Sequence, residues 1–140
     1  MKPLIIIPAR GGSKGIPRKN IRLLNGIPLI HYTIKAAQDV FDDTFICVST
    51  DDEEIRRVVE QTNLAVPFIR PKELASDFSG TNEVLLHAIE YYEKSGYMAD
   101  TVILLQPTSP FRNSSHIKDA LKLYSAEIDM LVSVKETKSN

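Results

Sequence analysis

Cysteine is almost absent from this sequence of 140 residues, and its scarcity limits the chemistry open to the chain. The one cysteine, Cys47, has no second cysteine in the chain with which to form a disulfide. It lies in the apolar run "TFICVS", which is typical of a buried structural thiol rather than of an exposed nucleophile. Scarce cysteine also fits a reducing compartment.

Long apolar runs are absent as well. No stretch of the sequence is long and apolar enough to cross a membrane as a helix. The N-terminal apolar run extends only from Leu4 to Ile7, and charge follows at Arg10. This pattern favours a buried strand over a signal peptide, so we expect a cytoplasmic protein without a membrane partner.

A strong net charge is also lacking, because the formal charge of the whole chain is −1. No global field would therefore attract nucleic acid, and we expect none as a partner. The charge is unevenly distributed, however. Residues 8–22 carry five basic side chains and no acidic one, whereas the rest of the chain has 12 basic and 18 acidic residues. Such a segment predicts either a local anion-binding site or a solvated basic loop.

The basic segment reads "PARGGSKGIPRKNIR" and combines glycines with cations. Its glycines would let backbone N–H groups approach a ligand closely and would permit positive φ angles. Arg10 can bind phosphate oxygens through two N–H groups, and the lysines can act as point charges. Both common phosphate-loop patterns, G-x-x-x-x-G-K-[ST] and G-x-G-x-x-G, are absent. From these residues alone, polyphosphate binding and a flexible surface loop both remain open.

Short β-branched runs alternate with helical patterns along the chain. The expected strands are Leu4–Pro8, Thr44–Ser49, Val66–Ile69, Thr101–Gln106 and Asp129–Val134. The expected helices are Pro28–Gln38, one that begins within Asp51–Glu54, Asn82–Lys94 and His116–Tyr124. This alternation predicts an α/β fold with three layers, a mostly parallel sheet with helices on both faces. Ligands of such sheets bind beyond the carboxyl ends of the strands, where 9–20, "STDD" and "QPTSPFR" would lie.

Four longer blocks are far more specific than the glycines alone. They are "IPARGGSKGIPRKN", "VSTDDEEI", "IRPKELASDFSGTNEV" and "LLQPTSPFR". In this order and spacing they resemble the cytidylyltransferases that activate nine-carbon acidic sugars, the CMP-N-acetylneuraminic acid synthetases. The resemblance extends over essentially the whole chain and implies a Rossmann-like nucleotidyltransferase fold.

The resemblance also implies a reaction and a set of site residues. The family transfers CMP from CTP to the sugar acid and releases pyrophosphate, so a catalytic role falls on Arg10 and Lys19, with Lys19 against the α-phosphate. Gln106 would face the sugar acid. The residues expected to bind the nucleotide are Ala9, Arg10, Gly11, Gly12, Ser13, Lys14, Lys19, Asn20, Arg70 and Thr81. The family has more often serine at the position of Thr81, and threonine keeps the hydroxyl.

The resemblance further implies a metal and a partner subunit. The family uses Mg²⁺, whose ligands we expect in a C-terminal half that follows these residues. On this interpretation, 1–140 is the nucleotide-binding part of a cytidylyltransferase domain, truncated at its C-terminus. The complete protein would form a homodimer, and no metal ligand is assigned within 1–140.

Several alternatives stay open at this point. The chain could bind CTP without catalysis, or the enzyme could act on legionaminic, pseudaminic or KDN-type acids. Adjacent acids such as Asp51 and Asp52 at a helix start more often cap the helix than bind a metal. Arg70 could be a surface arginine before a proline, and Gln106 could be a hydrogen-bonding residue at a strand end.

Overall fold

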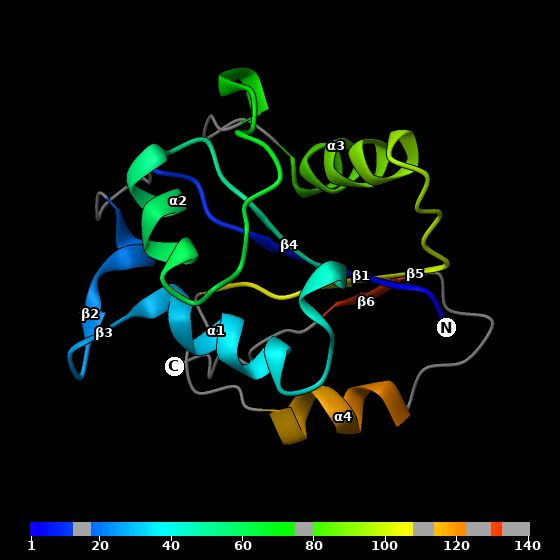
Figure 1. Cartoon of the computed structure of the whole chain (residues 1–140), viewed down its shortest axis with the longest axis horizontal. Coiled ribbons are helices and arrows are strands. Elements are labelled where there is room, and N and C mark those ends of the chain that lie inside the picture. The colour runs from blue at the N-terminus through cyan, green and yellow to red at the C-terminus, as the bar shows by residue number, and fades with distance from the viewer. Residues whose placement is uncertain (13–17, 75–79, 108–113, 123–129, 133–140) are drawn as a thin grey trace, which may run out of the picture.

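The computed structural model describes residues 1–12, 18–74, 80–107, 114–122 and 130–132. Its main sheet has four strands in the order β4-β1-β5-β6 (Figure 1). Every neighbouring pair in that sheet is parallel. The strands are β1 (Pro3–Pro8), β4 (Ile46–Ser49), β5 (Thr101–Leu104) and β6 (Met130–Val132), and β2 (Leu23–Leu24) with β3 (Ile27–Pro28) forms a separate hairpin.

Helices cover both faces of this sheet, with α3 on one side and α1 and α4 on the other (Figure 1). The α-helices are α1 (Leu29–Gln38), α2 (Glu53–Glu60), α3 (Thr81–Lys94) and α4 (Ser114–Lys122). Three short 3-10 helices are η1 (Lys19–Ile21), η2 (Asp43–Phe45) and η3 (Lys72–Leu74). The predicted three-layer α/β fold is confirmed.

Strand β1 is buried on both faces, as its continuous apolar run predicts for a central parallel strand. Ile5 and Ile7 belong to a core that includes Ile30 and Ile34 of α1. Leu4 and Ile6 point to the opposite face and join a second core with Leu85 and Ala88 of α3. This alternation of side chains along one strand builds two cores and fixes β1 at the centre of the molecule.

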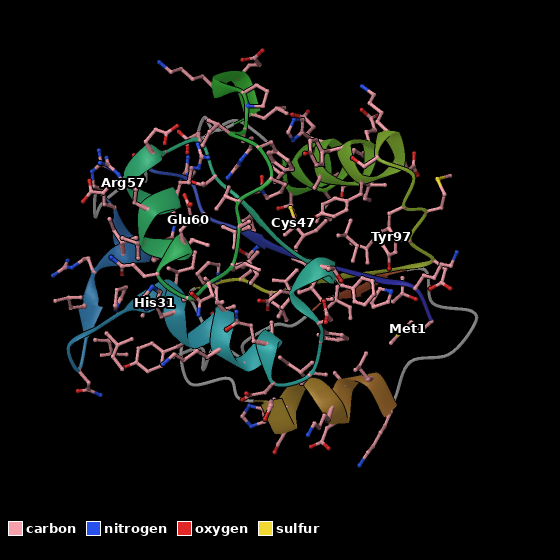
Figure 2. All side chains as sticks on the ribbon, viewed as in Figure 1. Met1, His31, Cys47, Arg57, Glu60 and Tyr97 are labelled. Carbon is pink, nitrogen blue, oxygen red and sulfur yellow. The ribbon has the colours of Figure 1, made fainter. Side chains whose placement is uncertain are left out.

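Cys47 lies on β4 in the core below α3 and is fully buried (Figure 2). Burial raises the pKa of the Cys47 thiol to about 12, and a hydrogen bond with Tyr92 only partly opposes that shift. The predicted buried structural thiol is confirmed. A thiol in this setting holds its proton and is a poor nucleophile.

We expect Cys47 in the folded protein to resist alkylation by iodoacetamide even at pH 9. At that pH an ordinary cysteine, with a pKa of about 8.5, is mostly thiolate. Peptide mass spectrometry of protein treated with and without denaturant would locate the label. Labelling of Cys47 in folded protein at the rate seen in denatured protein would contradict its burial.

The prediction of a strand at Val66–Ile69 is wrong. In its place the structure has one isolated parallel bridge between Ile69 and Thr50, which extends β4 by a single residue. Pro67 has no N–H to donate to a ladder, so regular pairing cannot run through this segment. The segment does lie beside β4, because the Arg70 N–H donates to the Thr50 carbonyl at 2.7 Å.

The hairpin β2–β3 is absent from the sequence-based expectations. Its two turn residues, Asn25 and Gly26, have φ angles of 53° and 78°. Positive φ at both central residues is the type I′ geometry that Asn-Gly favours between strands. The strands have only two residues each, too few for an alternating apolar pattern to be visible in the sequence.

Among the described residues, no helix is long and apolar enough to cross a membrane.

His31 of α1 joins α1 to α2, because its Nε2 lies 2.6 Å from the Val58 carbonyl oxygen (Figure 2). His31 is buried between these two helices and is a packing residue.

Candidate functional site

The site begins where β1 and β4 end side by side. Their register pairs Pro8 with Ser49, so the segments that follow the two strands leave the same edge of the sheet. The Ala9 N–H donates to the Ser49 carbonyl at 2.9 Å and continues the pairing by one residue. This is the edge at which parallel sheets bind ligands.

Gly11 lies directly after this pairing and passes very close to Asp52. A Cβ atom placed on Gly11 would lie 2.5 Å from Asp52 Oδ2 and 2.8 Å from Asp52 Cβ. The Gly11 N–H donates to Asp51 Oδ1 at 2.8 Å. Among the described glycines, positive φ occurs at Gly26 and Gly96, so a positive φ does not explain Gly11 or Gly12. Close approach to Asp52 is the reason that Gly11 carries no side chain.

Gly11→Ala should therefore lower the free energy of unfolding by about 2 kcal/mol, because the added methyl overpacks against a fixed side chain. Urea unfolding followed by circular dichroism measures the change. Gly12→Ala is the matched control for stability, since nothing lies within 4 Å of a Cβ at Gly12. Equal stability of the two variants would contradict the crowding at Gly11.

At Arg18 the chain again lies beside Gly11 and Asp52. Its backbone adopts the left-handed conformation, with φ 54°, and its N–H donates to the Gly11 carbonyl at 3.2 Å. Its guanidinium donates to Asp52 Oδ2 at 2.6 Å and lies 3.1 Å from Glu54. One of the five cations of the basic segment is thus paired with acids of α2 and its N-cap.

Asp52 also caps α2. Its Oδ1 accepts the N–H groups of Glu54 at 2.8 Å and Ile55 at 3.0 Å. Burial opposes ionisation of this carboxyl, but the hydrogen bonds from Ile55 and Arg18 outweigh it and lower its pKa. The stability gained from the ionised form is present above about pH 4 and is lost as the pH falls below it.

The two cations expected to be catalytic flank these anchored residues. Arg10 precedes Gly11, and its carbonyl accepts a hydrogen bond from Asn20 Nδ2 at 3.2 Å. Lys19 follows Arg18 and is half-buried at the start of η1. Among the described residues, no ion pair joins the Lys19 ammonium to a carboxylate.

Arg70 reaches the site from the segment beside β4 and is buried, with only 4% of its surface exposed. Its guanidinium donates to the Ser49 carbonyl and to the Leu74 carbonyl, each at 2.9 Å. Burial lowers the pKa of Arg70, the charge of Asp51 opposes that shift, and the charge of Arg10 adds to it. Arg70 is therefore no surface arginine; it closes the loop 70–74 onto the end of β4.

The other expected site residues follow β5, begin α3 or lie outside the described residues. Gln106 follows β5, the neighbour of β1 on the side opposite β4, and is half-buried. Thr81 is the exposed first residue of α3. Ser13 and Lys14 lie outside the described residues. The structure thus gathers the remaining expected site residues near the ends of β1 and β4: Ala9, Arg10, Gly11, Gly12, Lys19, Asn20 and Arg70.

The described part of the chain does not fit a resident metal ion. It contains no group of three or more His, Cys, Asp or Glu side chains that could hold one. Asp51 and Asp52 already accept hydrogen bonds from Gly11, Arg18 and the first turn of α2. For Asp52, the capping interpretation of this acid pair is confirmed.

Sequence reasoning missed the pairing of Arg18 with Asp52. The two residues are separated by 34 positions, and the pairing depends on the register of β1 against β4. The only sign in the sequence was an excess of cations in residues 8–22 and a group of acids at Asp51–Glu54. Such a pattern does not show which cation pairs with which acid.

The family is decided by a match that spans nearly all of the chain. The sequence model of the family described as "Cytidylyltransferase" matches residues 4–140. The chain belongs to the cytidylyltransferase family. In this member of the family, Arg10, Lys19 and Arg70 lie near the ends of β1 and β4.

Two curated relatives have names that state a substrate. The chain is 40% identical over 134 residues to the CMP-N,N'-diacetyllegionaminic acid synthase of Legionella pneumophila, covering 96% of this chain and 58% of the relative. It is 41% identical over 143 residues to the N-acylneuraminate cytidylyltransferase of Streptococcus agalactiae serotype V, covering 100% of this chain and 33% of the relative. The chain thus spans about half, or less, of the length of these relatives.

A solved structure agrees with the fold. The chain resembles CMP:2-keto-3-deoxy-manno-octonic acid synthetase in complex with CTP, with a TM-score of 0.70 and 25% sequence identity. The likeness covers 87% of this chain and 46% of that protein.

Proposed function

We propose that the protein transfers CMP from CTP to a nine-carbon acidic sugar of the N-acetylneuraminate type and releases pyrophosphate. The observation that carries the proposal is the cationic edge of the sheet in a chain of the cytidylyltransferase family. There Arg10 and Lys19 flank Gly11 and Arg18, which are held together at the end of β1. The names of the two curated relatives support a nine-carbon acid.

The proposed chemistry is a displacement at the α-phosphorus of CTP. A hydroxyl oxygen of the sugar forms the new P–O bond and its proton is lost to solvent, while the bond to the β-phosphate breaks and pyrophosphate leaves with the electron pair. Transfer of this kind depends on positioning and on charge stabilisation rather than on a protein nucleophile. In the proposal Lys19 stabilises the charge at the α-phosphate, Arg10 holds the triphosphate, and Gln106 faces the sugar acid.

Mg²⁺ belongs to the proposal as the partner of the triphosphate. Because the described residues do not fit a resident ion, its protein ligands would come from elsewhere in the protein, and no step is assigned to it. A homodimer and a cytoplasmic location are also proposed. Light scattering of the purified full-length gene product tests the first, and cell fractionation tests the second.

The test is pyrophosphate release by the purified full-length gene product, supplied with CTP and a panel of acids. The panel contains N-acetylneuraminate, legionaminate, pseudaminate and KDN, with an eight-carbon keto-deoxy acid for comparison. We expect release with a nine-carbon acid and with CTP in preference to ATP. Absence of release with every acid would overturn the proposal.

A second candidate is a CTP-binding unit without catalysis, which the short span of the chain relative to its curated relatives favours for residues 1–140 alone. Calorimetric titration with CTP separates the two functions. Binding by 1–140 without pyrophosphate release, beside an active full-length gene product, would assign binding to this part of the protein.

A further inference from the structure

Two consecutive acids, Asp51 and Asp52, each contact one residue of the basic segment. Asp51 accepts the N–H of Gly11 at 2.8 Å, and Asp52 accepts the guanidinium of Arg18 at 2.6 Å. Gly11 and Arg18 are also bonded to each other through the main chain at 3.2 Å. Neither contact is explained by metal binding or by the capping of α2 alone.

Each anchored residue is the direct neighbour of one proposed catalytic cation. Gly11 follows Arg10, and Arg18 precedes Lys19. A side chain is carried by its own backbone, so fixing Gly11 and Arg18 fixes where the Arg10 and Lys19 side chains start. The starting points of these two side chains are therefore linked to the acid pair that follows β4.

The acid pair is itself rigidly placed. Asp52 Oδ1 accepts two N–H groups of α2, while its Oδ2 accepts Arg18, so both oxygens are in use. Asp52 N–H in turn donates to Thr50 Oγ1 at 3.2 Å. The side chain of Asp52 is 15% exposed and that of Arg18 is 47% exposed, so the pair is buried on the side of the acid and open to solvent on the side of the base.

We propose that Asp51 and Asp52 are positioning residues for the transfer reaction, and that Arg18 is their anchor rather than a ligand of the triphosphate. Asp51 holds Gly11 and thereby Arg10, and Asp52 holds Arg18 and thereby Lys19. Positioning of this kind matters because a misplacement of about 1 Å can cost roughly a hundredfold in rate. The inference rests on the proposed transferase function.

The first test is a double-mutant cycle on Arg18 and Asp52 in the full-length gene product. Asp52→Asn keeps a good helix cap but loses the charge pair. We expect Arg18→Ala and Asp52→Asn each to lower kcat about tenfold, with little change in KM for CTP, and the double variant to be no worse than either single variant. A ligand of the triphosphate would instead raise KM for CTP, and its effect would multiply with that of Asp52→Asn.

The second test compares Asp51→Asn with Asp51→Ala. Asparagine keeps an oxygen that accepts the Gly11 N–H, so we expect it to retain most of the activity that alanine loses. If Asp51 were a metal ligand, both variants would lose activity alike and added Mg²⁺ would restore it. That result, or a multiplicative cycle, would overturn the inference.

Asp42→Asn is the matched control. Asp42 caps η2 at the opposite, amino end of β4, where its side chain accepts the Thr44 N–H at 2.9 Å. We expect its kcat and KM to equal those of the wild type. Wild-type protein that releases no pyrophosphate would overturn the proposed function, whereas active wild type with unchanged Asp51→Ala and Asp52→Asn variants would overturn only the positioning role.

Discussion

Lys19→Ala should lower kcat for pyrophosphate release by about a hundredfold to a thousandfold, the usual cost of removing one preorganised group that stabilises transition-state charge. Lys19 follows Arg18, whose guanidinium is held by Asp52 and Glu54, so its backbone is fixed at the edge of the sheet. Its own ammonium forms no ion pair with a carboxylate of the described residues. A lysine whose backbone is fixed and whose ammonium is not paired with a described carboxylate is suited to bind the α-phosphate.

The measurement is a steady-state assay of pyrophosphate release at saturating CTP and sugar acid, with the full-length gene product. Arg22→Ala is the matched control: Arg22 is an exposed cation of the same segment, three positions further on. We expect its kcat to be unchanged. If Lys19→Ala turned over at the wild-type rate, Lys19 would have no catalytic role.

The main features of the fold could be predicted from the sequence because they depend on local patterns. Leu4–Pro8 is apolar at every position up to the proline, which is the pattern of a strand covered on both faces, and β1 has that place. Asp51–Glu54 contains a capping residue followed by acids, and α2 begins there with Asp52 as its N-cap. In each case the deciding interactions lie within a few residues of one another.

The errors arise where the deciding contacts are distant or where one residue breaks a pattern. Val66–Ile69 has the composition of a strand, but Pro67 prevents regular pairing and leaves the single bridge at Ile69. Thr44 was expected in a strand, but Asp42 caps η2 there and β4 begins at Ile46. In each case a single residue, Pro67 or Asp42, overrides the strand pattern of the residues around it.

The position of the candidate site could be predicted from the sequence, but the hydrogen bonds and ion pairs within it could not. The ends of β1 and β4 follow from the parallel sheet, and the basic segment does lie there. The contacts of Gly11 with Asp51, of Arg18 with Asp52 and of Arg70 with Ser49 join residues 21 to 40 positions apart. Such pairs are fixed by strand register, which one sequence does not specify. The catalytic and binding roles expected for all of the site residues, from Ala9 to Gln106, stay predictions.

Arg70→Met should lower the free energy of unfolding by about 3 kcal/mol, because one buried and one partly buried carbonyl group would lose a charged donor. Arg70 joins the Ser49 carbonyl at the end of β4 to the Leu74 carbonyl at the end of η3. Methionine fills a similar volume without any N–H group, so the variant leaves both carbonyls without that donor while changing the packing little.

Two effects oppose this loss of stability, and their size decides whether Arg70→Met lowers or raises the free energy of unfolding. Burial of the guanidinium is costly, as its lowered pKa reflects, and its buried Nε has no hydrogen-bond partner among the described residues. Replacing a whole buried ion pair with apolar groups is often neutral or stabilising. Here, however, the two carbonyl partners belong to the main chain and cannot be replaced with Arg70, and the charge of Asp51 would also lose an opposite charge nearby. The net effect is therefore destabilising.

Urea unfolding of the Arg70→Met variant, with Arg57→Met as its matched control, measures the difference. Arg57 lies on the exposed side of α2 (Figure 2), where its Nε donates to the Glu53 carbonyl at 3.4 Å, and we expect its replacement to leave the free energy of unfolding unchanged. Arg70→Lys should lose nearly as much as Arg70→Met, because one ammonium lacks the planar fork that reaches two carbonyls in different directions. Equal stability of Arg70→Met and Arg57→Met would show that the burial cost cancels the two hydrogen bonds. Arg70 would then contribute its charge near the ends of β1 and β4 and not the stability of the loop that it closes.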